Sequence, residues 1–367
     1  METSCAAISV TTPGRVCLFG EHQDYLGLPV IPCAISLRIS MEARRREDMK
    51  IRIELPDIGS REEFSLAGPL PYVRERDYFR SAVNVLRREG YTFPGGLDCS
   101  VRGTIPINAG TSSSSALVVT WINLLAAMSD QNASLSPEEC ARFAHRAEVL
   151  EFGEPGGMMD HCAAAYGGVT TIEFMPEFVV EPLDVELGEF VLGDSGEPKD
   201  TKGMLSGVKD RVLGAVRFLR ERDSAFSLSG ADAGILPRAG SGLTPAQREL
   251  LGGTIRNRDI TREARALLST KPLDHRRLGE LLCEHQSVLR DILRISTPKI
   301  DRMLDAAAAA GAYGGKINGS GGGGCMFAYA PVNPGAVAEA VARAGGKPYI
   351  IRVDTGTRRD RAGHAPA

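Results

Sequence analysis

A run of small residues stands in front of a long apolar stretch, where it could bind an anion. The segment Pro106–Ala116 reads Pro-Ile-Asn-Ala-Gly-Thr-Ser-Ser-Ser-Ser-Ala. Small residues let a ligand approach the backbone, and the first turn of a helix offers unpaired N–H groups and the positive end of the helix dipole. Such a site suits phosphate groups, and the hydroxyls of Ser113 and Ser114 could add a hydrogen bond and a magnesium ligand. The alternative is a polar linker that ends in a serine N-cap.

A second polar segment follows an apolar run near the N-terminus. The segment Pro13–Tyr25 reads Pro-Gly-Arg-Val-Cys-Leu-Phe-Gly-Glu-His-Gln-Asp-Tyr. Glu21, His22 and Asp24 can accept hydrogen bonds from several neighbouring hydroxyls, as a sugar site requires. Arg15 adds a permanent positive charge that a phosphoryl-transfer site can use. A surface turn with incidental charges and a His22–Asp24 metal pair are the alternatives.

Two carboxylates, Glu148 and Asp160, flank a turn rich in glycine and proline. The turn Gly153–Gly157 reads Gly-Glu-Pro-Gly-Gly and could bring both carboxylates to one cleft. One of them could hold magnesium while the other accepts a proton from an attacking hydroxyl. The alternatives are an exposed helix charge for Glu148, a helix cap for Asp160, and a packing or capping role for His161.

A glycine-rich loop lies in the last quarter of the chain. The segment Lys316–Cys325 reads Lys-Ile-Asn-Gly-Ser-Gly-Gly-Gly-Gly-Cys and contains five glycines. Ordering so many glycines costs much conformational entropy, which favours a loop that needs close backbone approach. A glycine hinge without ligand contact is the alternative.

The elements that must position these segments mix strands and helices. Apolar or alternating runs separated by Pro, Gly and Asp predict strands at Ile8–Thr11, Arg15–Phe19, Val30–Ala34, Arg38–Arg44, Leu97–Gly103, Thr170–Phe174, Phe190–Gly193, Gly315–Ile317, Cys325–Ala330 and Tyr349–Val353. Helical periodicity predicts helices at Asp77–Glu89, Ala116–Met128, Pro137–Phe152, Met158–Tyr166 and Ala336–Ala344, and a mostly helical region from Thr201 to Ala310 with a break near Gly240–Leu243. This mixture predicts an α+β protein of two lobes, residues 1–185 and 186–367. We expect the charged tail after Thr355 to fray.

Composition narrows the classes of partner and location. A chain of 367 residues with 43% hydrophobic and 24% charged residues is typical of a globular protein with a sizeable core. The net charge of −3 gives no electrostatic reason to expect nucleic acid or an anionic membrane as a partner. The scattered cysteines show neither C-x₂-C spacing nor a compact disulfide framework, and the N-terminus does not resemble a signal peptide. We therefore expect a reduced, cytoplasmic protein.

Taken together and in this order, these segments resemble the motifs of the GHMP kinases, the family of galactokinase, homoserine kinase, mevalonate kinase and phosphomevalonate kinase. Gly14–Tyr25, with Val30-Ile-Pro32, resembles the galactokinase signature, and Gly110–Ser114 resembles the serine-rich nucleotide loop. Lys316–Cys325 resembles the third family motif. The resemblance covers nearly the whole chain and implies a two-lobed α+β fold, with an N-terminal lobe like a ribosomal-protein domain and a ferredoxin-like C-terminal lobe.

The resemblance also implies a role for each matching residue. Asp160 would be the catalytic base, and Arg15 would stabilise the deprotonating hydroxyl and the transferring phosphoryl group. The sugar would be held by Glu21, His22, Asp24 and Gly157. The phosphates of ATP would lie on Gly110, Thr111, Ser112, Ser113 and Ser114, and Mg²⁺ would be held by Ser114 and Glu148. The implied product is a sugar 1-phosphate.

Three departures from the galactokinase pattern bear on the substrate. Cys17 stands where galactokinases usually carry Asn, and Thr111 replaces the usual Leu of the serine loop. The stretch from Asp194 to Phe218 lacks the tyrosine that contacts the sugar in galactokinases. A sugar related to galactose is therefore included in the hypothesis. A mevalonate-type kinase and a sugar- and ATP-binding sensor without activity are the alternatives, although the Glu21-His22-x-Asp24 cluster disfavours mevalonate.

Overall fold

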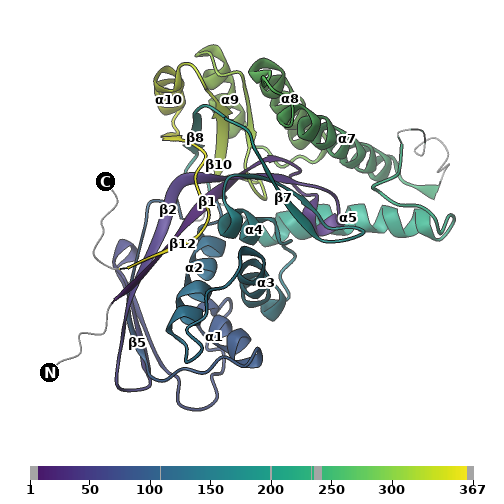
Figure 1. Ribbon diagram of the computed structural model, residues 1–367. Helices are drawn as coiled ribbons and strands as arrows, with labels where there is room; N and C mark the ends of the chain where they lie inside the picture. Colours follow the sequence, from purple (N-terminus) through teal and green to yellow (C-terminus); the bar gives the residue numbers. More distant parts are fainter. Residues whose placement is uncertain (1–6, 108, 199–200, 233, 235–241, 362–367) are drawn as a thin grey trace.

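The computed structural model describes residues 7–361 apart from 108, 199–200, 233 and 235–241. It contains two sheets, and the larger one is formed mainly by the first half of the chain (Figure 1). This mixed eight-stranded sheet has the order β12-β1-β2-β5-β3-β4, and β6 joins β2 and carries β7. β3 runs parallel to β5, whereas the other pairs are antiparallel. The strands are β1 (Ile8–Phe19), β2 (Ile31–Arg45), β3 (Lys50–Leu55), β4 (Ser60–Ser65), β5 (Leu97–Gly103), β6 (Val169–Glu173), β7 (Val179–Leu183) and β12 (Arg358–Arg361).

Helices cover one face of this sheet (Figure 1). They are α1 (Tyr78–Arg88), α2 (Ser113–Met128), α3 (Pro137–Glu148) and α4 (Met159–Tyr166). Ser136 and Glu139 form a reciprocal capping box that starts α3, with Pro137 at the first helical position. α2 is apolar on all sides because it lies between the sheet and the other helices, and its fully buried Trp121 donates to the carbonyl of Phe79 at 3.0 Å.

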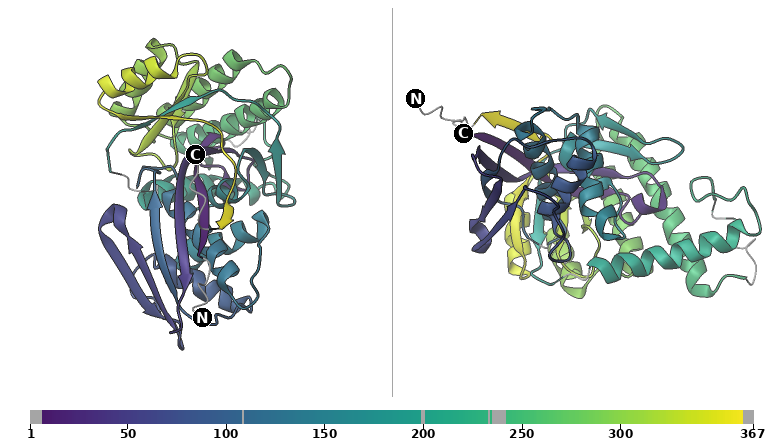
Figure 2. Two further views of the ribbon diagram at one scale, coloured as in Figure 1. Left: turned by 60° about the vertical axis from the view of Figure 1, so that its left-hand side comes forward. Right: turned by 90° about the horizontal axis from the view of Figure 1, so that it is seen from below.

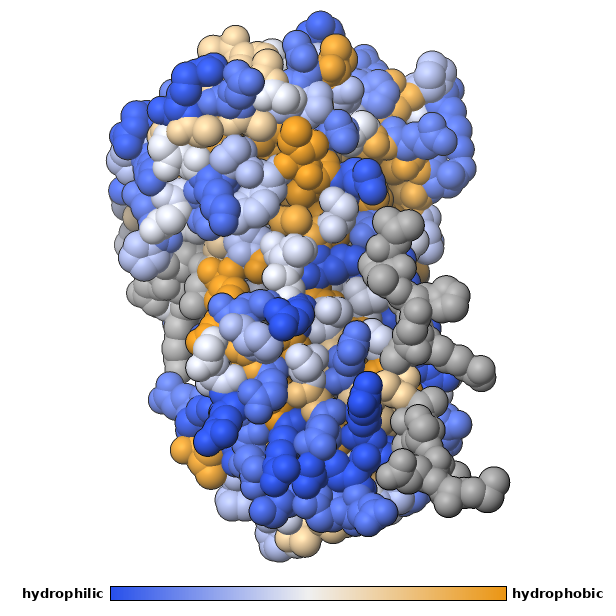
Figure 3. Space-filling view, turned by 90° about the vertical axis from the view of Figure 1, so that its left-hand side faces the viewer, coloured by the Kyte–Doolittle hydropathy of each residue, from blue (hydrophilic) through white to orange (hydrophobic). Residues whose placement is uncertain are grey.

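Away from the second sheet, the other face of the larger sheet is charged and open to solvent at β3 and β4. Arg52 and Lys50 on β3 pair with Glu63 on β4 at 2.9 and 3.2 Å. Hydrophilic residues accordingly dominate the lower half of this side of the molecule (Figure 3). The strands alternate apolar and polar residues as expected for a sheet with one buried face.

A second, antiparallel sheet of four strands has the order β11-β8-β10-β9. Its strands are β8 (Phe190–Asp194), β9 (Gly314–Ile317), β10 (Cys325–Tyr329) and β11 (Lys347–Ile351). Helices α8 (His275–Ser287), α9 (Pro298–Ala309) and α10 (Pro334–Arg343) pack on it. Figure 2 shows that the longer helices α5 (Thr201–Arg220) and α7 (Pro245–Leu268) extend away from both sheets. The short helical turns are η1 (Asp24–Leu26), η2 (Pro56–Ile58), η3 (Leu150–Phe152) and the π-helical η5 (Val288–Ile292).

β1 contributes to both hydrophobic cores. Val16 and Leu18 pack into the core shared with the second sheet, whereas Cys17 between them packs into the core under α1–α4. This division follows from the alternation of side chains along a strand. β1 therefore holds Arg15 and the loop after Phe19 at the junction between the two halves of the molecule.

The predicted α+β class is confirmed, but three local predictions were wrong. Ile8–Thr11 and Arg15–Phe19 form one strand, as do Val30–Ala34 and Arg38–Arg44, because β1 and β2 pair along most of their length despite register shifts near Pro13 and Cys17. The tail after Thr355 does not fray throughout, since Arg358–Arg361 pairs with Ile8–Thr11 as β12. Periodicity also did not predict β3, β4 or β7.

The boundary near residue 185 stays a prediction, although β12 returns from the second half of the chain to the first sheet. The break predicted near Gly240–Leu243 lies partly outside the described residues.

Among the residues that the structure describes, none of the helices is long and apolar enough to cross a bilayer.

Candidate active site

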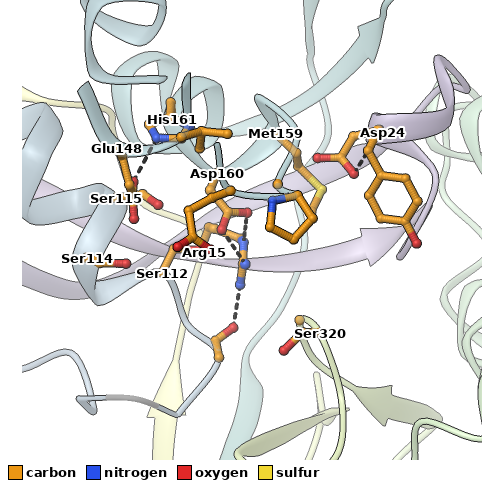
Figure 4. Close-up of a pocket in the computed structure, with 18 of the residues that line it drawn as sticks. Arg15, Asp24, Ser112, Ser114, Ser115, Glu148, Met159, Asp160, His161 and Ser320 are labelled. Carbon is orange, nitrogen blue, oxygen red and sulfur yellow. Dashed lines mark hydrogen bonds and ion pairs between the residues drawn. The ribbon is translucent and has the colours of Figure 1, made fainter. Parts of the chain in front are cut away.

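A cavity of about 570 Å³ lies where the segments singled out above converge. Its walls come from the end of β1 and the loop after it, the serine loop before α2, the end of α3, the turn before α4, and the glycine loop between β9 and β10. These segments are far apart in the sequence but meet around one space (Figure 4). The predicted site residues that line the cavity are Arg15, Glu21, His22, Asp24, Gly110, Ser112, Ser113, Ser114, Glu148, Gly157 and Asp160.

A two-pronged ion pair joins Arg15 to Asp160 at the centre of the cavity. The guanidinium donates through Nε to Oδ1 at 2.7 Å and through Nη2 to Oδ2 at 2.8 Å. Burial raises the pKa of Asp160, but the charge and hydrogen bonds of Arg15 outweigh this effect and leave the pKa below its ordinary value. The carboxylate is therefore ionised at neutral pH, and its side chain remains 29% exposed to the cavity.

The glycine loop supports this ion pair through Asn318. The Arg15 guanidinium also donates through Nη1 to the carbonyl of Gly110, and Asn318 Nδ2 donates to the same oxygen at 2.8 Å. Asn318 Oδ1 accepts from the backbone N–H of Cys17 at 2.9 Å. One fully buried amide thus ties β1, the serine loop and the glycine loop together.

Glu148 forms the acidic group at the other side of the cavity. It is 8% exposed and accepts a hydrogen bond from His161 Nε2 at 2.8 Å, so it is not the exposed helix charge that was the alternative. Burial raises the pKa of Glu148, but hydrogen bonds from His161, Ser114 and Ser115 outweigh it and lower the pKa. His161, assigned above to packing or capping, instead orients this carboxylate.

The serine loop turns sharply into α2 beside Glu148. Ser112 has a left-handed backbone with φ of 58° at the N-cap, and the first intrahelical N–H bond is that of Ala116 to the carbonyl of Ser112 at 2.9 Å. Helix α2 starts at Ser113, three residues earlier than predicted. The first-turn N–H groups of Ser113, Ser114 and Ser115 precede that bond, which leaves them for an anion in the cavity. Thr111 does not line the cavity; its carbonyl accepts from the N–H of Arg15 at 3.3 Å.

Asp24 and Gly157 meet at the end of the cavity away from Ser114. A Cβ atom on Gly157 would lie 2.0 Å from Asp24 Oδ2, so only glycine permits this approach. Burial and the charge of Asp160 raise the pKa of Asp24 to about 6. Figure 4 shows Asp24 on the opposite side of Arg15 and Asp160 from Ser114 and Glu148.

Glu21 and His22 line the cavity but are also engaged by the C-terminal half. Both carboxylate oxygens of Glu21 are taken, one by Lys316 Nζ and one by the backbone N–H of Gly319. The ring of His22 contacts the hydroxyl of Tyr25 through Nδ1 at 2.7 Å and the carbonyl of Ser320 through Nε2 at 3.0 Å. These bonds make the glycine loop a wall of the site rather than a hinge.

Several residues of the site and its supports were missed by reasoning from the sequence. Asn318 and Ser320 were treated as part of a backbone loop, although they are its polar residues among the glycines, and that contrast was a usable signal. Arg76 pairs with Glu154 at 2.9 Å on the cavity wall. Nothing in the spacing connects these two residues, which are brought together only by tertiary folding.

The side chains beside the serine loop fit a magnesium ion held partly by phosphates. Mg²⁺ typically takes one or two protein oxygens and completes its octahedron with phosphate oxygens and water. The ionised carboxylate of Glu148 and the hydroxyl of Ser114 provide such oxygens on one side of the cavity (Figure 4). Across the described residues there is no cluster of three or more His, Cys, Asp or Glu side chains that could hold a metal by itself.

Comparisons with known proteins agree with this architecture. The GHMP kinases N terminal domain matches residues 77–168, the GHMP kinases C terminal domain matches residues 264–349, and the galactokinase galactose-binding signature matches residues 2–45. Mevalonate kinase of Pyrococcus furiosus is 30% identical, over 94% of this chain and 96% of its own length. Galactokinase of the same organism is 28% identical, over 88% of each chain. The crystal structure of Lactococcus lactis galactokinase complexed with galactose superposes with a TM-score of 0.85 at 22% identity, covering 97% of this chain and 95% of that one.

Proposed function

This chain belongs to the GHMP kinases, ATP-dependent enzymes, and on that premise we propose that it phosphorylates a monosaccharide, galactose or a related sugar, to the sugar 1-phosphate. The observation that carries the proposal is the placement of the ionised Asp160, clamped by Arg15, between the serine loop and Asp24. An acceptor hydroxyl beside Asp160 would face phosphates bound at the serine loop. The galactokinase signature over residues 2–45 supports a sugar as the acceptor.

In the proposed reaction, Asp160 accepts the proton of the anomeric hydroxyl. The sugar oxygen forms a bond to the γ-phosphorus while the bond from that phosphorus to the β–γ bridging oxygen breaks, and ADP leaves. Arg15 keeps the Asp160 carboxylate oriented, and its positive charge offsets negative charge on the transferring group. The low pKa of Asp160 keeps it unprotonated and ready to accept.

The nucleotide would bind at the other side of the same cavity. The N-terminal turn of α2 and the loop residues Gly110, Ser112 and Ser113 would cradle the phosphates. Ser114 and Glu148 would hold Mg²⁺, which neutralises phosphate charge when bound. His161 keeps Glu148 in place for this role.

Electrostatics at the acceptor side favours a neutral substrate. Lys316 pairs with Glu21, and Arg15 pairs with Asp160. Among the described residues that line the acceptor side of the cavity, Asp24 is therefore the carboxylate without an ion-pair partner. Asp24 is largely ionised above its pKa of about 6. An uncharged sugar hydroxyl can donate to it, whereas a substrate carboxylate would be repelled.

Phosphorylation of mevalonate is the second candidate, favoured by the 30% identity to mevalonate kinase over 94% of the chain. An assay of ADP release separates the two. Purified protein with Mg·ATP would be offered galactose, arabinose, glucuronate, fucose, N-acetylgalactosamine and mevalonate. We expect turnover with a neutral sugar and its loss in Asp160→Asn. Turnover with mevalonate alone would overturn the sugar proposal while keeping the family.

A further inference from the structure

Ser320 carries a buried hydroxyl that the protein leaves without a partner. Ser320 is 6% exposed and lines the cavity. Its Oγ has no hydrogen-bond partner within the described part of the chain. A buried hydroxyl without a partner is costly, and native proteins rarely keep one without a function. Figure 4 shows Ser320 across the cavity from Asp160, on the side away from Ser114.

The backbone around Ser320 is fixed on both sides. The N–H of Gly319 donates to Glu21, and the N–H of Gly322 donates to the carbonyl of Ile295 at 2.7 Å. The carbonyl of Ser320 itself contacts His22 Nε2 at 3.0 Å. Between Gly319 and Gly324, Ser320 is the residue that has a side chain. The hydroxyl is therefore presented by a preorganised loop, and a ligand that binds it does not have to order the loop first.

We propose that Ser320 is a specificity-determining residue that hydrogen-bonds a hydroxyl of the acceptor substrate. The inference rests on the proposed function and assigns to the C-terminal half a direct contact with the sugar. Serine can donate and accept at once, so it fits a sugar hydroxyl, which does the same. The contact is assigned to the acceptor rather than to ATP because Ser320 is held by His22 and lies away from the serine loop.

The test replaces Ser320 with alanine, which removes the oxygen and keeps the Cβ. Steady-state kinetics would be measured for D-galactose and for ATP, together with the monodeoxygalactoses that lack the hydroxyl at position 2, 3, 4 or 6. We expect Ser320→Ala to lower kcat/KM for galactose about tenfold while the KM for ATP stays the same. One deoxy sugar should be a poor substrate of the parent protein and should lose little further in the variant, which identifies the contacted hydroxyl.

Ser195→Ala is the matched control. Ser195 is also buried, and its N–H donates to the carbonyl of Gly324 of the same loop, but its hydroxyl already accepts from the N–H of Glu197 and does not line the cavity. This variant should leave acceptor kinetics unchanged. Unaltered galactose kinetics in Ser320→Ala, or a change confined to the KM for ATP, would overturn the inference. If mevalonate rather than a sugar proves to be the acceptor, the proposed function fails, and the same variant pair decides Ser320 through the KM for mevalonate.

Discussion

Two ion pairs involve β1 and the loop after it, and they differ in what surrounds them. Arg15 and Asp160 face the cavity, and the Asp160 side chain is 29% exposed. Lys316 and Glu21 are closed off, with side-chain exposures of 0% and 1%. Both pairs join distant parts of the chain. Only the first leaves a carboxylate that a substrate can reach.

The difference separates a group that can react from one that holds the structure. Asp160 is oriented by Arg15 and can still accept a proton from a ligand in the cavity. Both oxygens of Glu21 already accept hydrogen bonds from Lys316 and Gly319. The sugar-binding role predicted for Glu21 would therefore be exerted through the shape of the loop that it anchors. The charge types of the two pairs are the same, so their surroundings decide their roles.

We call Arg15–Asp160 the open pair and Lys316–Glu21 the closed pair. The largest effect is expected from Asp160→Asn, which changes the open pair. The amide is close in shape but cannot accept the hydroxyl proton, so we expect kcat to fall by about a hundred- to ten-thousand-fold. The measurement is ADP release with the best substrate of the panel. ATP binding, followed by calorimetry, should persist because the serine loop is unchanged. Retention of most of the activity would place the base elsewhere.

Breaking the closed pair should lower the stability of the folded protein rather than its activity directly. Lys316→Met leaves the Glu21 carboxylate buried without its cation, which we expect to cost about 3–5 kcal/mol in the free energy of unfolding. Urea denaturation followed by circular dichroism measures this loss.

The double variant Lys316→Met/Glu21→Gln is the control for that prediction. The glutamine removes the buried charge but keeps an oxygen that can accept from the N–H of Gly319. It should recover most of the stability lost by the single variant. A single variant as stable as the parent protein would show that the pair is not closed in solution.

The same contrast explains what the sequence could predict. Arg15, Asp160 and the serine loop were identified because their residue types and order resemble the GHMP motifs, and the cavity brings most of the predicted residues together. The partner of Glu21 could not be predicted, because Lys316 lies 295 positions away and nothing local connects them. β12 was missed for a similar reason, since a charged tail forms a strand only when β1 offers it an edge.

Substitution of Asn318, which connects the glycine loop to the open pair, should have a smaller effect on activity. Asn318→Leu removes the donor to the carbonyl of Gly110, and Arg15 is then held less firmly against Asp160. We expect kcat to fall about ten- to a hundredfold with little change in the KM for ATP. Weaker pairing should also raise the pKa of Asp160, so the acidic limb of the kcat–pH profile should move to higher pH.

Gln286→Met is the matched control for Asn318. Gln286 is another buried amide next to the same strand, and its Oε1 accepts from the N–H of Ile317 at 2.9 Å, but its Nε2 donates to Ser296 and Asp301 and not to the carbonyl of Gly110. This variant should lose stability without a shift of the pH profile. The same shift in both variants would mean that Asn318 acts only through general destabilisation.

The smallest effect is expected on substitution of Asp24, which belongs to neither pair but lies close enough to Asp160 for that charge to raise its pKa. Burial and the charge of Asp160 raise its pKa from 3.8 to about 6, whereas Arg15 favours its ionised form. Between these values the folded protein binds more protons at this site than the unfolded chain. The contribution of Asp24 to stability is therefore fully present below about pH 4 and is lost as the pH rises past about 6. Asp24→Asn removes this dependence, so the variant should gain about 1–2 kcal/mol over the parent protein between pH 4 and pH 7.5. Urea denaturation at several pH values measures the gain, and a constant difference across that range would show that folding does not raise the pKa of Asp24.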